Sequence, residues 1–440
     1  MKIVKTILIA IYRFSVQWNL FMLAAFILSL ATKHISKNGK YRILALSKPV
    51  FIEDVNAINE DSNDLYFMMF PRLLLREYVK KFSNILEIDS KVKYHPTLDG
   101  TLEQEEIYLS VQKMFLYLQR FLNFDAIFAG NYTYSGEQEF FRVAKKQGIP
   151  VIILYKEGLA PPGSMTETVS KKLYTDKYFI GSKMLFYNNI TRQALINARI
   201  PGITLNNTLT VGIPRLDKYF RINKQGKSNH IVLFTFEPEQ KAFRFVDDDS
   251  KVALYINRGE EFQANVIRYC NENNDFHLTI KTKGHDLAKS TLRRILSKYG
   301  IDNLSNNIEI TSSISSYDLI TQSTYVAGFA STTLLEAVLL GRPILCPYFS
   351  DITPADKVDF FAEHPEVSNY IKDYTGLKNL MNGNSKIKLA NPEIINVALK
   401  PLLFSLDGNA SERVSMEIIK TVESSKKGNS IELLLENDSG

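Results

Sequence analysis

Cysteine is scarce in this chain, and its scarcity excludes a framework of disulfide bonds. The 440 residues contain two cysteines, Cys270 and Cys346, in distant segments whose patterns predict a helix and a strand. Such usage is typical of a reducing compartment. The spacings C-x-x-C and H-E-x-x-H are missing and the six histidines are scattered, so we expect neither a bound metal nor a cofactor.

A strong excess of one charge is also missing. The chain balances 53 Lys and Arg against 47 Asp and Glu, which leaves a net charge of +6. A protein that binds nucleic acid is typically more one-sided, so we expect no nucleic-acid partner. The hydrophobic fraction of 45% is typical of a globular protein, and the length predicts two domains with additional elements.

The amino end holds an uncharged run, "FSVQWNLFMLAAFILSLA", at residues 14–31. Its length approaches that of a membrane span. We therefore predict a hydrophobic membrane-associated helix within residues 1–40, which either crosses the bilayer or lies on its surface. A buried first helix is the alternative. Basic residues flank the run on both sides and give no orientation: Arg13 before it, and Lys33, His34, Lys37 and Lys40 after it.

Residues 41–225 read as the first of two Rossmann-like domains. The pattern begins with a strand at 41–49, and helices are predicted around 65–86 and 102–122. A strand at 124–130, a helix at 136–148 and a strand at 149–158 follow. This alternation predicts a parallel sheet.

Residues 226–390 repeat the same alternation and form the second predicted domain. A polar stretch at 221–229 marks the boundary. We expect closing helices at 391–424 and a flexible tail at 425–440. The predicted elements of this half are strands at 230–236, 276–285, 307–313, 325–330 and 343–349, and helices at 258–273, 287–299 and from 331. The fold class is therefore α/β, with two doubly wound domains facing a cleft.

Ligands of open parallel sheets bind outside the carboxyl ends of the strands. Glu157 lies in the loop that follows the strand "VIILY" and is a candidate general base, although it could equally be a solvated loop acid or pair with Lys156. Lys283 and His285 follow the strand "LTIK". Because residues i and i+2 of an extended segment face the same side, they could converge on one anionic group. An exposed turn is the alternative.

The segment "VAGFASTTLLEAVLLGRPILCP" is the strongest candidate. Gly328 leaves room for a ligand to approach the backbone, and Ser331 and Thr332 stand at the start of a helix whose free amides favour an anion. Glu336 interrupts the apolar body of this helix and needs a partner. A ribose hydroxyl pair would serve, and a structural partner is the competing interpretation.

The turn "TVGIPRLD" at 210–217 closes the first predicted domain. Its Arg215 could reach the cleft. The alternatives are that Arg215 pairs with Asp217 or lies on the interdomain surface, and the sequence supports these equally well.

Together these residues resemble glycosyltransferases of the two-Rossmann-domain B fold. The nearest resemblance is to bacterial surface-polysaccharide enzymes with cytidine-nucleotide donors, namely CDP-glycerol glycerophosphotransferases, capsule Kdo transferases and sialyltransferases. "TVGIPRLD", "KGHD" and "STTLLEAVLLGRPIL" carry the likeness, which spans roughly residues 41–390. In two places the chain departs from the pattern, because Asp286 replaces a proline and Lys156 replaces an acid.

The resemblance implies a role for each matching residue. Lys283 and His285 would contact donor phosphate or cytidine, Ser331 and Thr332 would hold phosphate, and Glu336 would bind ribose. Glu157 would be the catalytic base.

The predicted function is metal-independent transfer of a sugar from a CMP- or CDP-linked donor to a glycan or lipid-linked acceptor, at the cytoplasmic face of the inner membrane. Two alternatives stay open. One is a UDP-N-acetylhexosamine 2-epimerase, which resembles the same fold. The other is a non-catalytic assembly scaffold.

Overall fold

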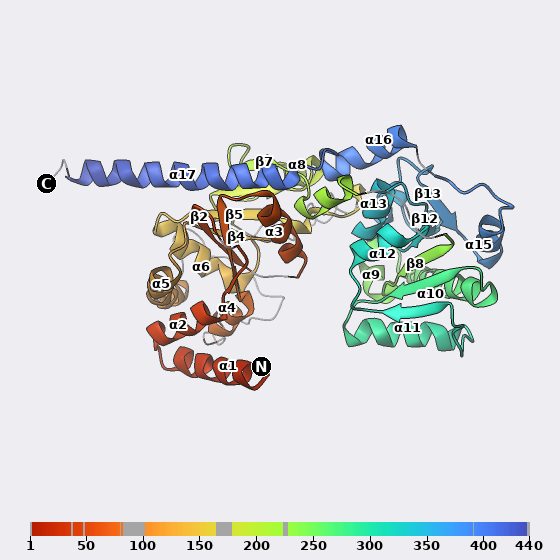
Figure 1. Cartoon of the computed structure of the whole chain (residues 1–440), viewed down its shortest axis with the longest axis horizontal. Helices are drawn as coiled ribbons and strands as arrows, with labels where there is room; N and C mark the ends of the chain where they lie inside the picture. The colour runs from red at the N-terminus through yellow and green to blue at the C-terminus, as the bar shows by residue number, and fades with distance from the viewer. Residues whose placement is uncertain are drawn as a thin grey trace. The chain divides into compact units, whose positions relative to one another are not determined.

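The computed structural model describes residues 2–36, 38–46, 49–79, 81, 102–163, 178–222, 228–389 and 391–437. Within them the chain forms two compact α/β units (Figure 1). Unit 1 lies within Met1–Gly158, Thr168–Lys218 and Asp407–Gly440, and unit 2 within Leu159–Glu167 and Tyr219–Leu406. Each unit has its own sheet and its own hydrophobic core.

Unit 1 is built on a seven-stranded sheet with the order β1-β3-β2-β4-β5-β6-β7. All neighbours are parallel except β1, which pairs antiparallel with β3. The inner strands are continuous apolar runs because both faces of a parallel sheet are buried. The strands are β1 Lys33–His34, β2 Tyr41–Leu46, β3 Leu65–Phe70, β4 Ala126–Ala129, β5 Val151–Tyr155, β6 Lys183–Phe186 and β7 Thr208–Thr210.

Helices cover both faces of the sheet of unit 1. In Figure 1, α17 (Ala410–Asn437) runs along one side of the sheet, and α2 (Phe21–Ala31) and α5 (Leu102–Leu122) lie on the other. The other helical elements of this unit are α1 Lys2–Gln17, α3 Pro49–Asp61, α4 Arg72–Val79, α6 Ser135–Lys146, α8 Asn189–Asn197 and the 3₁₀ turns Lys156–Gly158 and Pro214–Phe220, the second of which continues to the first residues of unit 2.

The helix predicted at 65–86 is wrong in its first part. Leu65–Phe70 forms β3, whose side chains are almost all buried, and the helix α4 begins only at Arg72. The run "LYFMMF" lacks the polar alternation that would mark it as a strand, since the strand is covered on both faces. Residues 80 and 82–86 of the predicted helix lie outside the described residues.

The amino-terminal hydrophobic run is two helices rather than one. Helix α1 ends at Gln17, Asn19 takes a left-handed backbone conformation with φ of 55°, and α2 begins at Phe21. Four residues of α2 are buried against the rest of unit 1: Ala24, Ala25, Ile27 and Leu28. Among the described residues no helix combines the length and the apolar character that crossing a bilayer requires. The predicted single hydrophobic helix is therefore corrected to a helical pair.

Unit 2 contains a fully parallel six-stranded sheet with the order β10-β9-β8-β11-β12-β13. Its strands are β8 His230–Phe234, β9 His277–Lys281, β10 Ile308–Thr311, β11 Tyr325–Ala327, β12 Ile344–Pro347 and β13 Ser368–Ile371. Its helices are α9 Pro238–Phe245, α10 Asp249–Glu272, α11 Asp286–Lys298, α12 Ser316–Gln322, α13 Thr332–Leu339, α14 Ala355–Val358, α15 Tyr374–Met381 and α16 Pro392–Leu403. Two Rossmann-like units with parallel sheets make this a glycosyltransferase-B-like fold.

The compact units divide the chain at Lys218, and the chain returns to unit 1 at Asp407. Part of the predicted boundary segment, 223–227, lies outside the described residues. The predicted flexible tail is corrected over 425–437, because helix α17 continues to Asn437. The rest of that tail, 438–440, also lies outside the described residues.

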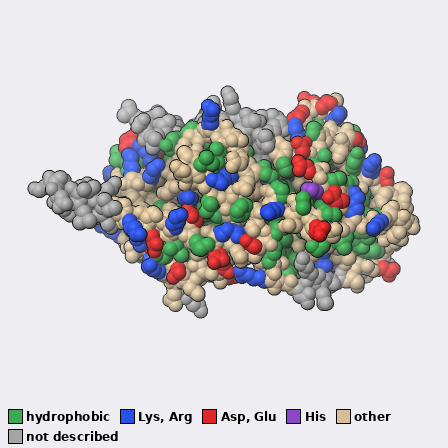
Figure 2. Space-filling model, turned by 90° about the horizontal axis from the view of Figure 1, so that it is seen from above, with side chains coloured by type: hydrophobic (Ala, Val, Ile, Leu, Met, Phe, Trp, Pro, Cys, Tyr) green, Lys and Arg blue, Asp and Glu red, His purple; other side chains and the backbone are tan. Residues whose placement is uncertain are grey.

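Charged side chains do not gather into a field of one sign on the face shown in Figure 2. There, Lys and Arg side chains are interspersed with Asp and Glu. This distribution agrees with the small net charge of the sequence.

Candidate functional site

The strand order of unit 2 shows at which edge of its sheet the candidate residues lie. Strands β9, β8 and β11 are neighbours, and all three are parallel. The segments that leave their carboxyl ends therefore emerge at one edge of the sheet, where ligands of such folds bind. These segments carry Lys283 and His285 after β9, the sequence from Gly328 after β11, and Glu237 after β8.

Glu237 joins two of the predicted site residues. Its carboxylate accepts a hydrogen bond from Lys283 Nζ at 3.0 Å, and its Oε1 lies 3.8 Å from His285 Nε2. Glu237 is 4% exposed, whereas the side chains of Lys283 and His285 are 57% and 50% exposed. Within the described structure no donor reaches the buried Oε1. A buried carboxylate thus holds a lysine whose ammonium group still faces solvent.

His285 has a fixed tautomer because it caps helix α11. Its Nδ1 accepts a hydrogen bond from the backbone N–H of Ala288 at 3.1 Å, so that nitrogen cannot carry a proton. The proton of the neutral ring therefore resides on Nε2. At 3.8 Å from Glu237 this N–H is too distant for a hydrogen bond to the carboxylate. It is left as a donor toward an oxygen of a bound ligand.

The turn between β11 and α13 has a strained backbone at its centre. Ala330 takes a φ of 42°, a left-handed conformation that non-glycine residues rarely adopt. Lys241 Nζ donates to the carbonyl of Phe329 at 3.0 Å. A Cβ added to Gly328 would meet only ordinary contacts, the nearest at 3.6 Å, so nothing in the protein itself requires glycine there.

Ser331 and Thr332 stand at the start of α13 as predicted, and both are half-buried. Ser331 is the N-cap, and its Oγ accepts hydrogen bonds from the backbone N–H of Thr333 at 3.4 Å and from its hydroxyl at 2.9 Å. The serine side chain is thus engaged within the helix start. What it leaves for an anion is mainly the remaining amides of the first turn.

Glu336 is buried and has a partner from the protein. Its Oε2 accepts a hydrogen bond from the hydroxyl of Tyr219, whose ring packs edge-on against Tyr317 at a centroid distance of 5.0 Å. This is the structural partner that the sequence left open as an alternative. A role toward ribose stays a prediction.

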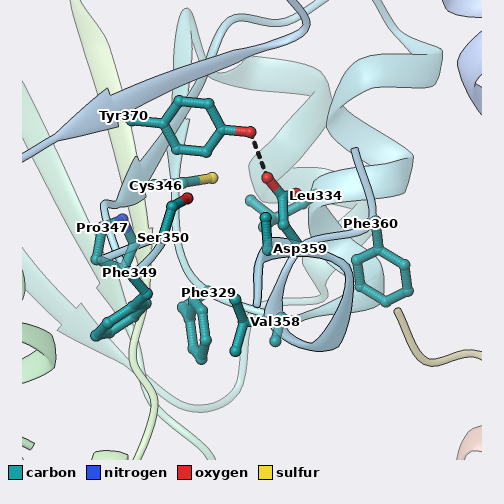
Figure 3. A pocket seen from close by; sticks show the side chains of 12 residues that line it. Phe329, Leu334, Cys346, Pro347, Phe349, Ser350, Val358, Asp359, Phe360 and Tyr370 are labelled. Atoms are coloured by element: carbon teal, nitrogen blue, oxygen red, sulfur yellow. Dashed lines mark hydrogen bonds between the residues drawn. The ribbon is translucent and has the colours of Figure 1, made fainter. Parts of the chain in front are cut away.

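A small pocket lies beside this turn, at the carboxyl ends of β11 and β12. In Figure 3 aromatic side chains, among them Phe329 and Phe349, line its floor, and Tyr370 reaches across it to Asp359. The Tyr370 hydroxyl donates to Asp359 Oδ2, and Asp359 Oδ1 accepts from the Phe361 N–H at 2.8 Å. Desolvation in this pocket raises the pKa of the Asp359 carboxyl. The pocket is therefore mainly apolar, with one polar pair.

Asp359→Asn should make unit 2 more stable at neutral pH. A carboxyl whose pKa is raised on folding binds its proton more tightly in the folded chain, so the free energy of unfolding falls as pH rises from the unfolded pKa of about 3.9 through the higher folded-state pKa. The asparagine oxygen can accept from the Phe361 N–H, and its amide group can donate to the Tyr370 hydroxyl oxygen, so both partners are kept without a charge. The variant should gain roughly 1.4 kcal/mol over wild type per unit of pKa elevation.

Urea unfolding of both proteins between pH 4 and pH 8 measures this effect. The stability difference should grow in favour of the variant as pH rises. A difference that shrinks with pH would show that Asp359 is better stabilised as a carboxylate in the folded chain.

Glu157 lies in unit 1, in the 3₁₀ turn that follows β5. Its Oε1 accepts hydrogen bonds from Lys156 Nζ at 2.6 Å and from the Tyr134 hydroxyl at 2.9 Å. Its side chain is 38% exposed, while that of Lys156 is only 7% exposed. Pairing with Lys156, one of the alternatives left open by the sequence, is thus present. It leaves the carboxylate accessible at the carboxyl edge of the sheet, and the role of base stays a prediction.

Arg215 belongs to the core of unit 1. Its guanidinium donates to both oxygens of Asp54, at 3.2 and 3.1 Å, and to the Tyr187 hydroxyl at 3.0 Å. Arg215 is 7% exposed and Asp54 is fully buried. Arg215 is thus paired with a buried carboxylate of unit 1, while Asp217 accepts hydrogen bonds from the backbone N–H groups of Ala410 and Ser411 at the start of α17. A role of Arg215 toward a ligand stays a prediction.

Two polar residues of the candidate site were missed by the sequence interpretation, Glu237 and Lys241. Glu237 follows the strand "HIVLFTF" directly, and Glu157 follows "VIILY" after one intervening residue, so the same rule would have selected Glu237. Lys241 carries no such signal. It lies one turn into α9 and reaches the β11 segment only through the tertiary fold.

Comparison with known proteins finds a shared fold and no sequence family. No protein-family model and no curated protein matches the sequence. A solved structure of a protein from Listeria monocytogenes assigned as a UDP-N-acetylglucosamine 2-epimerase is 12% identical, covering 88% of this chain and 98% of its own, with a TM-score of 0.51. A second solved UDP-N-acetylglucosamine 2-epimerase is 14% identical, covering 87% and 96%, also with a TM-score of 0.51. At this identity the likeness establishes the fold, and these neighbours are enzymes named for a nucleotide sugar.

The predicted main function is corrected by this result. The neighbouring structures are UDP-N-acetylglucosamine 2-epimerases and give no support to a transferase that uses a CMP- or CDP-linked donor. The epimerase is the alternative that the sequence left open. The motif resemblance misled because blocks such as "STTLLEAVLLGRPIL" serve the glycosyltransferase-B-like fold in general, so they do not separate its reactions.

Proposed function

We propose that this chain is a UDP-N-acetylhexosamine 2-epimerase. The observation that carries the proposal is the Lys283, His285 and Glu237 cluster at the carboxyl edge of the sheet of unit 2, in a fold shared with such epimerases over most of both chains. An ammonium group and a ring N–H, both exposed, are donors suited to the diphosphate of a nucleotide sugar.

The diphosphate is assigned to unit 2. Lys283 neutralises one phosphate, His285 Nε2–H donates to it, and the first-turn amides of α13 at Ser331 and Thr332 receive the other. Glu237 is a positioning residue, because its buried carboxylate holds the Lys283 ammonium in place. Stabilisation of the leaving diphosphate by fixed positive groups lowers the barrier to breaking the bond at C1.

Inversion at C2 of the sugar requires that the C2–H bond be broken as the diphosphate leaves C1, which forms a C1=C2 double bond. A proton must then be added to the opposite face of C2 while the diphosphate oxygen bonds again to C1. A residue that accepts the C2 proton must be ionised and accessible. Glu157 meets both conditions, since Lys156 and Tyr134 both donate to its Oε1 and its side chain is partly exposed. We retain Glu157 as the proposed proton acceptor, now for a carbon acid rather than for an acceptor hydroxyl.

Incubation with UDP-GlcNAc alone tests the proposal. Wild type should form the C2 epimer without any acceptor, and Glu157→Gln should form none while UDP still stabilises it against heat. A nucleotide present at a hundred times its Kd adds about 2.7 kcal/mol to the free energy of unfolding. Stabilisation by CMP or CDP but not by UDP, with no epimer formed, would overturn the proposal.

A further inference from the structure

The amino-terminal helical pair of unit 1 carries a row of apolar side chains on its outer side. On α1 and the turn after it, Ile7, Ile11, Phe14 and Trp18 are 52%, 40%, 55% and 66% exposed. Their spacing of four, three and four residues places them on one face of the helix. The opposite side of α1 is occupied, because Tyr12 and Val16 are buried.

The turn and α2 carry further exposed apolar side chains. Leu20 is 42% exposed, and Met22, Phe26 and Leu30 are 59%, 46% and 59% exposed, the last three at intervals of four residues. A helix whose outer stripe is as apolar as its buried stripe is unusual at a surface in water. We call these eight side chains together the N-terminal apolar face: Ile7, Ile11, Phe14, Trp18, Leu20, Met22, Phe26 and Leu30.

Helix α5 extends this face beside α2. The rings of Phe26 and Phe121 meet edge-on at a centroid distance of 5.8 Å, and Lys113 Nζ lies 5.6 Å from the centroid of the Phe21 ring. Lys113 and Arg120 are exposed on α5, as are Leu116 and Phe121. Apolar side chains at this margin therefore alternate with basic ones whose stems can lie along the apolar surface.

The charged residues around the N-terminal apolar face indicate what binds to it. The first acidic residue of the chain is Glu53, and every charged side chain before it is basic: Lys2, Lys5, Arg13, Lys33, Lys37, Lys40, Arg42 and Lys48. Among the described residues of α1, the charged side chain that borders the apolar row is Arg13, which pairs with Glu77 of α4 at 3.1 Å. Two acidic side chains, Glu77 of α4 and Glu106 of α5, also lie near α1 and the turn after it, and each has a basic neighbour, Arg13 and Lys81 respectively. An apolar face whose own charged residues are all basic is complementary to anionic lipid head groups. A contact between two copies of the same face would bring like charges together.

We propose that the N-terminal apolar face docks onto an anionic lipid bilayer, with α1 and α2 lying in the interface rather than crossing it. Trp18 stands in the turn between the helices, with its ring 6.2 Å from that of Phe14. Tryptophan is the residue that favours the boundary between head groups and acyl chains. The apolar row enters that boundary while Arg13, Lys113 and Arg120 stay at head-group level. The proposal rests on unit 1 alone and is independent of the reaction.

Vesicle binding by the full chain tests the proposal, and the sequence supplies its own probe. Trp18 is the single tryptophan, so its fluorescence reports on this face alone. With vesicles that contain phosphatidylglycerol, the protein should co-float, the Trp18 emission should move to shorter wavelength, and brominated acyl chains should quench it. With vesicles of phosphatidylcholine alone, binding should be weaker.

Two variants separate the apolar from the electrostatic contribution. Ile7→Ser, Ile11→Ser and Phe14→Ser combined should reduce partitioning at least about tenfold, since each removes a large apolar group. Lys113→Gln with Arg120→Gln should reduce it about 25-fold on anionic vesicles only, because each basic residue near the surface contributes about fivefold. The matched control replaces three equally exposed residues of unit 2, Leu254→Ser, Ile310→Ser and Val397→Ser, which are 47%, 50% and 57% exposed.

The outcomes are distinct. Loss of binding in the first triple variant but not in the control supports the proposal, and Phe14→Ser alone serves if the triple variant does not fold. Absence of binding by the wild type to either vesicle, with unchanged Trp18 emission, would overturn it. A wild-type dimer that the triple variant converts to a monomer, without vesicle binding, would assign the face to a second copy instead and equally overturn it.

Discussion

Replacing Arg215 by methionine should lower the free energy of unfolding of unit 1 by about 3–5 kcal/mol, because it leaves a buried carboxylate without its cation. Asp54 is fully buried, and its two oxygens receive hydrogen bonds from Arg215 and from the Tyr187 hydroxyl. Burial and the Asp54 charge raise the pKa of Tyr187 well above its usual value, so the phenol stays a neutral hydrogen-bond donor to Asp54.

Urea unfolding monitored by circular dichroism measures this loss. The matched control is Arg13→Met, which removes a pair whose arginine side chain is 63% exposed and should cost no more than about 1 kcal/mol. Asp54→Leu combined with Arg215→Met should recover part of the loss, since no buried charge is left unpaired. A stable Arg215→Met protein that binds UDP poorly would contradict the account and return Arg215 to the ligand.

The second large effect is expected at the diphosphate. Lys283→Ala should weaken UDP binding about 10- to 150-fold, because a hydrogen bond from a charged group contributes about 1.5–3 kcal/mol. His285→Asn should weaken it by about 2- to 10-fold. Asparagine keeps an oxygen that can cap α11, so this variant removes the Nε2–H donor without unravelling the helix start.

Calorimetric titration with UDP measures both variants. Lys289→Ala, an exposed lysine one turn into the same helix, is the control and should leave the Kd unchanged. Lys283→Ala also deprives Glu237 of its partner, so the Lys283→Ala and Glu237→Gln double variant tests whether the loss comes from phosphate contact rather than from a disturbed carboxylate. Wild-type affinity in that double variant would remove Lys283 from the site.

Much of the fold could be predicted because the buried strands of a parallel sheet appear in the sequence as short apolar runs. Helix α5 was predicted at 102–122, where the structure has Leu102–Leu122, and β8 and α11 lie within a few residues of their predicted bounds. The sequence does not predict β3 because the run "LYFMMF" is compatible with either a buried strand or a buried helix. Only its position between β1 and β2 in the sheet shows that it is a strand.

The candidate site could be predicted only as far as the strand ends allow. Lys283, His285 and Ser331 are predicted as candidates because each follows a strand, and the rule that ligands bind there needs no tertiary information. The hydrogen-bond partners of the candidate residues could not be predicted from the sequence. Arg215 pairs with a carboxylate 161 residues away, and the Tyr219 hydroxyl reaches Glu336 across 117 residues. The reaction was assigned wrongly because the matching motifs belong to the fold.

The central claim concerns the hydrogen at C2 of a UDP-N-acetylhexosamine, and proton NMR in deuterium oxide observes it directly. UDP-GlcNAc incubated with the wild-type protein alone should lose its C2 proton signal as deuterium enters, while the signals of the C2 epimer appear at the same rate. Glu157→Gln should show neither change. UDP-GlcNAc that keeps its C2 proton throughout, in a protein shown to bind UDP, would contradict the account.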